Sequence, residues 1–317
     1  MRAVLYATLA KAELVSKLGA ILGDKLTVVD DAEALAKAMP EADALFIGDM
    51  LYVGKVAEAV LNHGHKLKWV QILTAGYDQV KKFGVPNNAP VTNVGDALAP
   101  GVGLHALSLL LTLQRQVPAY VKNQDKHGWN RSAAAKMTTP IGQTSAVLGF
   151  GHIGREIARL MRALGSHVIG VSRTGAADPG ADEMMPFSKI DDVVKRADSI
   201  MISLPLDSAT RHLFNARLLG LCKTNAIIVN IARGGIIDQI ALTEALKAGT
   251  IAGASLDVTD PEPLPPDHPL WDAPNLYVSP HCAGAAGALT TSRISDKAVE
   301  NLKRYLANEP LKDVVKL

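Results

Sequence analysis

Residues 145–165 read SAVLGFGHIGREIARLMRALG, and this stretch decides the fold of the chain. An apolar run typical of a buried strand ends at Leu148, and Gly149, Gly151 and Gly154 then match the pattern G-x-G-x-x-G. In such a turn the first glycine allows a tight bend, the second lets the backbone approach a pyrophosphate, and the third lets helix and strand pack closely. The helix predicted after the turn has apolar residues on one face: Ile153, Ile157, Leu160, Met161 and Leu164.

The glycine turn predicts a binding site for a nicotinamide dinucleotide, because the amino end of the following helix faces the anion. A glycine turn that binds no nucleotide is the alternative, and the strand and helix on either side disfavour it. We expect the cofactor to contact the whole turn, which consists of Gly149, Phe150, Gly151, His152, Ile153 and Gly154.

The end of the next predicted strand, HVIGVSRTG at residues 167–175, bears on the choice of cofactor. An acidic residue there accepts hydrogen bonds from the adenosine ribose of NAD, whereas a cation suits the 2′-phosphate of NADP. Ser172, Arg173 and Thr174 offer one cation and two hydroxyl groups without a carboxylate. We therefore expect NADP(H) to be preferred and NAD(H) to be possible. Arg173 as a solvated turn residue, or stacked on the adenine of NAD, is the alternative.

Short apolar runs alternate with helical patterns along most of the chain, which is typical of parallel sheets covered by helices. The runs form two series, one before residue 95 and one from Thr144 onwards, so we expect two α/β units. Between the two series, residues 101–121 predict a long buried helix and residues 122–140 a protruding loop. A last helix is expected over residues 291–308, with Ile294, Ala298, Leu302 and Leu306 on one stripe.

Three polar residues follow predicted strands: Arg233 in VNIARGG, Glu262 in LDVTDPEPLP and His281 in YVSPHCAG. Open parallel sheets bind ligands at these strand ends. A histidine can transfer a proton to a carbonyl oxygen, a carboxylate can orient that histidine and raise its pKa, and an arginine can bind a substrate carboxylate. Taken singly, each residue also fits an ordinary structural role. Together they predict the reduction of a 2-oxo acid.

Composition excludes several other classes of protein. The 33 basic and 31 acidic residues are spread along the chain, so no nucleic-acid or membrane surface stands out. Cys222 and Cys282 fit neither a disulfide framework nor a zinc cluster, and we expect no metal. The first residues lack the pattern of a signal peptide, and cytoplasmic residence is expected.

With these motifs, the sequence resembles the D-isomer-specific 2-hydroxyacid dehydrogenase family over nearly its whole length. The matching segments, in the family's order, are VLGFGHIGREIARLMRALG, SLPLDSATRHLFN, AIIVNIARGGIIDQIALTEALKAGTIAGASLDVTDPEPLP and NLYVSPHCAGA. The resemblance implies a Rossmann cofactor domain at residues 100–287, inserted into a flavodoxin-like substrate domain at residues 1–99 and 288–317. Among family members, the NADP-preferring glyoxylate/hydroxypyruvate reductases are the most similar in pattern.

The resemblance also implies roles for individual residues. Arg233 binds substrate, Glu262 supports His281, and His281 is the acid/base. A turn of Thr74, Ala75, Gly76 and Tyr77 receives the substrate carboxylate through backbone N–H groups, with an ordinary turn as the alternative. Further cofactor contacts are implied for Pro205, Thr210, Ile231, Ala232 and Asp257, the last as an acceptor for the carboxamide.

Two departures from the family pattern affect detail. Gly103 and Leu104 precede His105 where relatives often have Ala-Glu, and Thr259 stands where an aromatic residue is common.

The expected activity is the reduction of small 2-oxo acids such as glyoxylate or hydroxypyruvate. Phosphite oxidation and a nucleotide-sensing corepressor remain alternatives, while Glu262 argues against formate oxidation. Relatives dimerise through the region equivalent to Gln116–Thr139, so a homodimer is expected.

Overall fold

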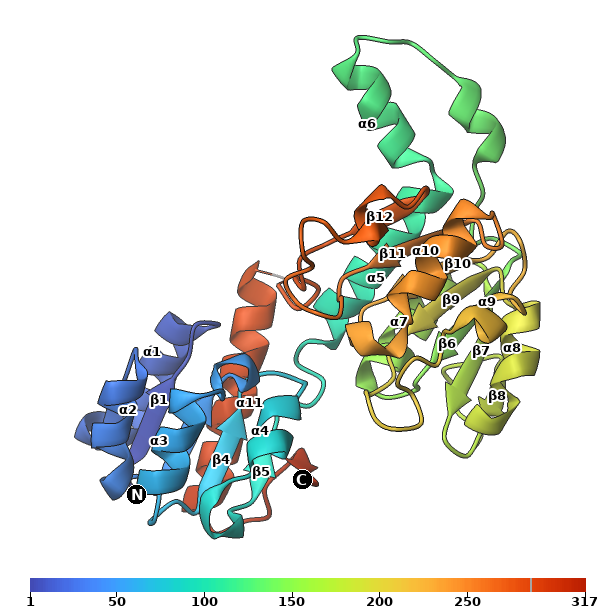
Figure 1. Ribbon diagram of the computed structural model, residues 1–317. Coiled ribbons are helices and arrows are strands. Elements are labelled where there is room, and N and C mark those ends of the chain that lie inside the picture. Colours follow the sequence, from blue (N-terminus) through green and yellow to red (C-terminus); the bar gives the residue numbers. More distant parts are fainter. Residues whose placement is uncertain (286) are drawn as a thin grey trace. The chain divides into compact units, whose positions relative to one another are not determined.

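The computed structural model describes residues 1–285 and 287–317, which form two compact units (Figure 1). The first unit contains Met1–Leu98 and the residues that follow Ala285, and the second contains Ala99–Ala285. These bounds lie within two residues of those expected from the sequence. Each unit has a parallel sheet covered by helices, which confirms the predicted fold class.

The first unit is built on a sheet in which the strand order is β13-β5-β4-β3-β1-β2, and β13 is antiparallel to β5. Its strands β3 and β4 are buried at every residue, and all of these residues except Gln71 are apolar. The strands are β1 (Ala3–Tyr6), β2 (Leu26–Val28), β3 (Ala44–Ile47), β4 (Trp69–Ile72), β5 (Val91–Thr92) and β13 (Val314–Val315). The helices are α1 (Lys11–Leu22), α2 (Ala32–Ala38), α3 (Lys55–His63), α4 (Asp78–Phe83) and α11 (Gly287–Leu306).

Helix α11 returns the chain to the first unit, where it packs against α1. Ile294, Ala298 and Leu302 are fully buried, as the stripe of apolar residues predicts. Leu306 is 50% exposed, so its expected place on the buried stripe was wrong. It is the last residue of the helix.

The second unit has a fully parallel sheet with the strand order β12-β11-β10-β9-β6-β7-β8. Chain order reverses at β6, so β6 and β9 flank the switch point at which such sheets bind nucleotides. The strands are β6 (Thr144–Leu148), β7 (His167–Ser172), β8 (Glu183–Pro186), β9 (Ser199–Ile202), β10 (Ile227–Asn230), β11 (Gly253–Leu256) and β12 (Leu276–Val278).

Helices cover both faces of this sheet. Helices α5 (Ala99–Gln114) and α7 (His152–Ala163) pack against each other and against the central strands. The opposite face is covered by α8 (Ile190–Arg196), α9 (Ala216–Leu219) and α10 (Gln239–Lys247), whose apolar residues share one core cluster with β6, β9 and β10. The rigid parallel sheet thus presents its strand ends, where the candidate residues stand, at one edge.

The expected long buried helix over residues 101–121 is interrupted. Helix α5 ends at Gln114, Gln116 has a left-handed backbone (φ 57°), and a separate helix α6 (Val117–Asp125) begins, with Pro118 in its first turn. Proline has no N–H to donate to the preceding turn, so it favours the start of a new helix over the continuation of α5. No residue of α6 is buried.

Helix α6 and the chain that follows it form an arm that projects from the rest of the second unit (Figure 1). The arm, defined here as residues 116–139, includes a 3-10 helix at Ser132–Lys136. Trp129 at the far end of the arm is 97% exposed. The predicted protruding loop is therefore present, although its first residues are helical.

No helix in the described part of the chain is long and apolar enough to cross a membrane. The most apolar helix, α5, has 16 residues, and about 20 apolar residues are needed to span the hydrocarbon layer. The 20-residue helix α11 contains charged side chains such as Lys297 and Arg304.

Candidate active site

The three catalytic candidates follow three neighbouring strands of the second unit. Arg233 lies three residues after β10, Glu262 six residues after β11, and His281 three residues after β12. Because β10, β11 and β12 are parallel neighbours, their carboxyl ends meet at one edge of the sheet. The fold therefore brings together residues that are separated by up to 48 positions in the sequence.

His281 and Glu262 are in direct contact. The Nδ1 atom of His281 lies 2.8 Å from Oε2 of Glu262, and Oε1 accepts a hydrogen bond of 3.0 Å from the backbone N–H of Thr259. Both side chains are about one-third exposed (35% and 33%), so the imidazole is partly covered and still accessible. Thr259 thus supports the carboxylate through its backbone, and the missing aromatic side chain does not disturb that contact.

The contact changes the acidity of both groups. The hydrogen bond that His281 donates to the negatively charged Glu262 raises the pKa of His281 against the opposing effect of burial. Burial alone would raise the pKa of Glu262, but the hydrogen bond and charge of His281 outweigh it, and the pKa is lowered. The pair therefore favours an imidazolium beside a carboxylate, which is suited to protonating an oxygen.

Arg233 lies within electrostatic range of this pair. Its positive charge lowers the pKa values of both His281 and Glu262 as a smaller contribution. Asn230 brackets the arginine segment, donating to the Arg233 carbonyl at 2.9 Å and accepting from the Ala232 N–H at 3.0 Å. A Cβ on Gly234 would lie 2.0 Å from the Thr259 backbone, so only glycine allows this close approach.

Asp257 anchors the segment that contains His281. The carboxylate is 1% exposed, and Oδ1 accepts from the Ser279 hydroxyl (2.7 Å) and the Cys282 N–H (3.0 Å). Oδ2 accepts from the Ala283 N–H at 2.9 Å, and the Asp257 carbonyl accepts from the His281 N–H at 2.8 Å. Both oxygens therefore already have partners within the chain, in addition to any carboxamide contact.

The predicted glycine turn joins β6 to α7 as expected. Gly149 has a φ of 94°, and a Cβ there would lie 2.6 Å from the Ser203 carbonyl oxygen. A Cβ on Gly154 would lie 1.9 Å from the Gly149 carbonyl oxygen, whereas one on Gly151 would meet nothing within 4 Å. Gly151 and His152 are exposed at the amino end of the 12-residue helix α7. These features fit a dinucleotide, since the open position is the one where backbone must approach the pyrophosphate.

The remaining predicted cofactor residues fall into two groups. Arg173 and Thr174 are exposed after β7, and the Ser172 hydroxyl accepts from the Gly175 N–H at 3.0 Å. Thr210 is buried and donates to the Pro205 carbonyl at 2.7 Å, so its hydroxyl shapes the loop after β9. Ile231 and Ala232 are buried at the end of β10.

In the first unit, the predicted substrate turn Thr74–Tyr77 follows β4 and is held by side chains from its neighbours. The Thr74 hydroxyl donates to the Gly76 carbonyl at 2.9 Å, and the Asn93 side-chain amide donates to the Ala75 carbonyl at 2.9 Å. Asp49 accepts from the Gln79 and Val80 N–H groups at 3.0–3.1 Å, which fixes the start of α4. These contacts predetermine the shape of the turn.

The residues that support the catalytic segments and the substrate turn were not predicted from the sequence. Asp49 and Asn93 gave no signal beyond their places after β3 and β5. The end of β7 at Ser172–Thr174 contains no acidic residue, but Asp178 follows it six residues after β7. Its carboxylate forms an ion pair with Arg155 at 2.9 Å. His105 was noted only for the departure in front of it, although its imidazole contacts Ser279. Contacts between residues far apart in sequence have no local pattern from which they can be predicted.

A parallel sheet with this strand order, a glycine turn at its switch point and a histidine–carboxylate pair at the same edge are features typical of nicotinamide-dependent dehydrogenases. The model of the NAD binding domain of D-isomer specific 2-hydroxyacid dehydrogenases matches residues 107–283. The chain belongs to this family.

Relatives within the family differ in substrate. The chain is 36% identical over 310 residues to D-3-phosphoglycerate dehydrogenase of Mycobacterium tuberculosis, covering 93% of this chain and 56% of that protein. It thus spans about half the length of such relatives. It is 31% identical to glyoxylate reductase of Aeropyrum pernix, covering 86% and 82%. The solved NADPH-dependent glyoxylate/hydroxypyruvate reductase of Sinorhizobium meliloti, in complex with NADP and sulfate, is 27% identical with a TM-score of 0.84, covering 100% and 98%.

Proposed function

We propose that this protein reduces small 2-oxo acids with uncharged side chains to 2-hydroxy acids, with NADPH as the preferred cofactor and His281 as the proton donor. The 2.8 Å contact between His281 and Glu262, beside the charge of Arg233, is the main support for this proposal. Bound nicotinamide supplies the hydride for the substrate C2 carbon. All other parts of the reaction fall to residues of the chain.

His281 provides the proton that the reduced oxygen requires. Its Nδ1 atom faces Glu262, so Nε2 is the atom left to donate to the substrate oxygen. Glu262 stabilises the imidazolium and fixes its orientation, which keeps the proton available at neutral pH. Arg233 binds the substrate carboxylate and polarises the oxo group, and the backbone N–H groups of Thr74–Tyr77 supply further donors.

The preference for NADPH rests on the strand end after β7. Arg173 is exposed there, free to approach a 2′-phosphate, and Ser172 and Thr174 add hydroxyl groups. The relative from Sinorhizobium meliloti is described as NADPH-dependent, which is consistent with the proposal. The Arg155–Asp178 pair keeps the nearby carboxylate partly neutralised. Binding of NAD(H) remains possible.

The proposed preference for substrates with uncharged side chains rests on the loops of the first unit. Three loops follow β1, β3 and β4, which are neighbours in the sheet, and they comprise residues 7–10, 48–54 and 73–77. Asp49 is the one charged residue in these loops, and its buried carboxylate is used to fix α4. A phosphate on the substrate, as in D-3-phosphoglycerate, would meet no cation here. Glyoxylate and hydroxypyruvate fit this surface.

A substrate panel tests the proposal. The purified protein is mixed with NADPH or NADH and each of glyoxylate, hydroxypyruvate, pyruvate and 3-phosphohydroxypyruvate, and cofactor oxidation is followed. We expect turnover of glyoxylate, hydroxypyruvate and pyruvate, and little turnover of 3-phosphohydroxypyruvate. Absence of turnover with every 2-oxo acid, or activity with phosphite and an oxidised cofactor instead, would overturn the proposal.

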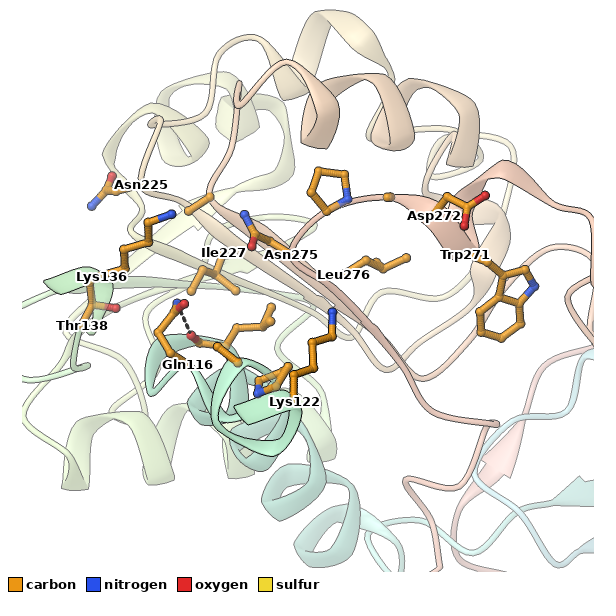
Figure 2. A pocket seen from close by; sticks show the side chains of 16 residues that line it. Gln116, Lys122, Lys136, Thr138, Asn225, Ile227, Trp271, Asp272, Asn275 and Leu276 are labelled. Carbon is orange, nitrogen blue, oxygen red and sulfur yellow. Dashed lines mark hydrogen bonds between the residues drawn. The ribbon is translucent and has the colours of Figure 1, made fainter. Parts of the chain in front are cut away.

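We also propose that the protein is a cytoplasmic homodimer in which two arms clasp two second units. Beside the arm lies a groove of about 750 Å³, lined by Gln116 and Lys122 of the arm and by Trp271, Asn275 and Leu276 (Figure 2). Apolar side chains are exposed on the arm, namely Trp129 (97%), Val121 (50%) and Val117 (43%), and Trp271 of the groove is 49% exposed. So many exposed apolar residues on one segment are typical of an interface between subunits.

A further inference from the structure

His105 is joined to the segment that contains the proposed proton donor, although it lies on helix α5, at the other end of the second unit's sequence. Its Nε2 atom is 3.1 Å from the Ser279 hydroxyl oxygen and 3.2 Å from Oδ1 of Asp257. The Ser279 hydroxyl donates its hydrogen to Asp257 Oδ1 at 2.7 Å. Its oxygen is thus an acceptor for the His105 Nε2–H, which makes His105 the outer donor of the network.

The segment Ser279–Ala283 needs such support because its backbone is strained. His281 has a φ of 50°, a left-handed conformation that is unfavourable for a non-glycine residue unless its surroundings enforce it. Asp257 enforces it through hydrogen bonds from the N–H groups of His281, Cys282 and Ala283. The position of the Asp257 carboxylate therefore sets the direction in which His281 points.

Helix α5 gives the network a fixed base. Gly103, two residues before His105, lies so close to α7 that a Cβ would be 2.8 Å from the Cγ of Glu156. Leu109 and Leu110 of α5 are buried, and the Ser255 hydroxyl of β11 donates to the Leu109 carbonyl at 3.2 Å. The imidazole of His105 is 25% exposed and approaches Asp257 from this packed helix.

His105, Asp257 and Cys282 also have potential metal-ligand atoms within 4.8 Å of one another. Both Asp257 oxygens, however, already accept hydrogen bonds from two backbone N–H groups and a hydroxyl. A metal ion would have to displace these donors. The cluster is therefore better explained as a satisfied hydrogen-bond network.

We propose that His105 is a positioning residue for the reaction: through Ser279 and Asp257 it fixes the segment Ser279–Ala283, so that His281 faces Glu262. The proposal rests on the assignment of His281 as the proton donor. The charged groups that act on His281 are Glu262, Arg233 and Asp257, and His105 acts through the last of these.

The test compares His105→Leu, which removes the donor, with His105→Gln, whose amide N–H groups reach toward the same acceptor. Ser108→Ala is the matched control, because Ser108 lies on the same helix and its hydroxyl donates to the Leu104 carbonyl on the exposed side. For each variant, kcat, both KM values, the pH profile of kcat and the thermal midpoint are measured. His281→Ala is assayed in parallel.

We expect His105→Leu to lower kcat about tenfold, the equivalent of one hydrogen bond, and to shift the pH profile to lower pH, with little change in the cofactor KM. His105→Gln is expected to recover most of kcat, and Ser108→Ala to resemble the parent. Ser279→Ala should produce the same loss of kcat, and the double variant no further loss, because both act through one network.

An unchanged kcat and pH profile in His105→Leu overturns the proposal, as does a loss of kcat that His105→Gln fails to rescue. If His281→Ala also keeps its activity, the assignment of the proton donor fails instead.

Discussion

His281 Nδ1 lies 2.8 Å from Glu262 Oε2, and this contact joins the loops that follow β11 and β12. The two residues are 19 positions apart, and their meeting depends on the parallel pairing of their strands. The same edge of the sheet contains Arg233, whose charge acts on both. The chemistry of the proposed reaction thus depends on strand order.

Glu262→Gln is expected to shift the pH profile of reduction to lower pH. Reduction needs protonated His281, and Glu262 raises the pKa of His281. A neutral amide removes that charge, so His281 loses its proton at lower pH and the rate of reduction declines earlier as pH rises. Oxidation of the 2-hydroxy acid needs neutral His281 and is expected to extend to lower pH. The profiles of kcat in both directions check this, and two unshifted profiles would contradict the coupling.

His281→Ala is expected to lower kcat by about 10²- to 10⁴-fold, because the proton donor is lost. Binding of NADPH should change little, since the glycine turn after β6 is untouched. Stopped-flow turnover and cofactor titration by fluorescence measure the two quantities separately. Turnover near that of the parent protein would exclude His281 as the acid/base.

Arg173→Ala is expected to raise the KM for NADPH about tenfold or more, the equivalent of a charge-assisted hydrogen bond of ~1.5–3 kcal/mol. The KM for NADH serves as the internal control and should change little, because NADH has no 2′-phosphate. Steady-state kinetics with both cofactors give the comparison. Equal increases in the KM values for NADPH and NADH would indicate that Arg173 stacks on the adenine. A parent protein that prefers NADH would refute the NADPH assignment.

Met50→Arg is expected to raise kcat/KM for 3-phosphohydroxypyruvate about tenfold or more relative to hydroxypyruvate, because it adds a cation to loops that have none. Met50 is 67% exposed beside Asp49, whose N–H lies 3.4 Å from the Thr74 hydroxyl of the substrate turn. Leu61→Arg is the matched control, since Leu61 is 37% exposed on α3. If both variants change the ratio of the two kcat/KM values equally, the loops after β3 and β4 do not select the substrate.

The arm is expected to be the dimer contact. Sedimentation equilibrium of the parent protein should give a dimer at micromolar concentration. Trp129→Glu should weaken the dimer by at least about thirtyfold, because a buried aromatic side chain at an interface contributes ~2 kcal/mol or more. Leu61→Glu, on a helix of the first unit, should leave it unchanged. A monomeric parent protein would contradict the proposed assembly.

Local patterns were sufficient to predict the elements of this fold. The alternation of apolar runs and helices predicted two parallel sheets, and GFGHIG identified the strand–turn–helix because glycine is required where backbones approach within 3 Å. The positions of Arg233, Glu262 and His281 after predicted strands also followed from the sequence, whereas the order of the strands in each sheet came from the structure. The break at Gln116 was missed, although the polar residues Gln114–Gln116 and Pro118 were local signals of it.

The sequence by itself determined which residue types stand where the chemistry is needed, because motif, periodicity and turn residues are local properties of the chain. Tertiary structure alone decided that Asp257 accepts hydrogen bonds from the segment of His281, that His105 reaches this network from α5, and that Asn93 and Asp49 hold the turn Thr74–Tyr77 and the helix after it. These partners are between 18 and 174 positions apart. They meet because folding buries polar groups that must then find hydrogen-bond partners, and the available partners depend on which elements pack together.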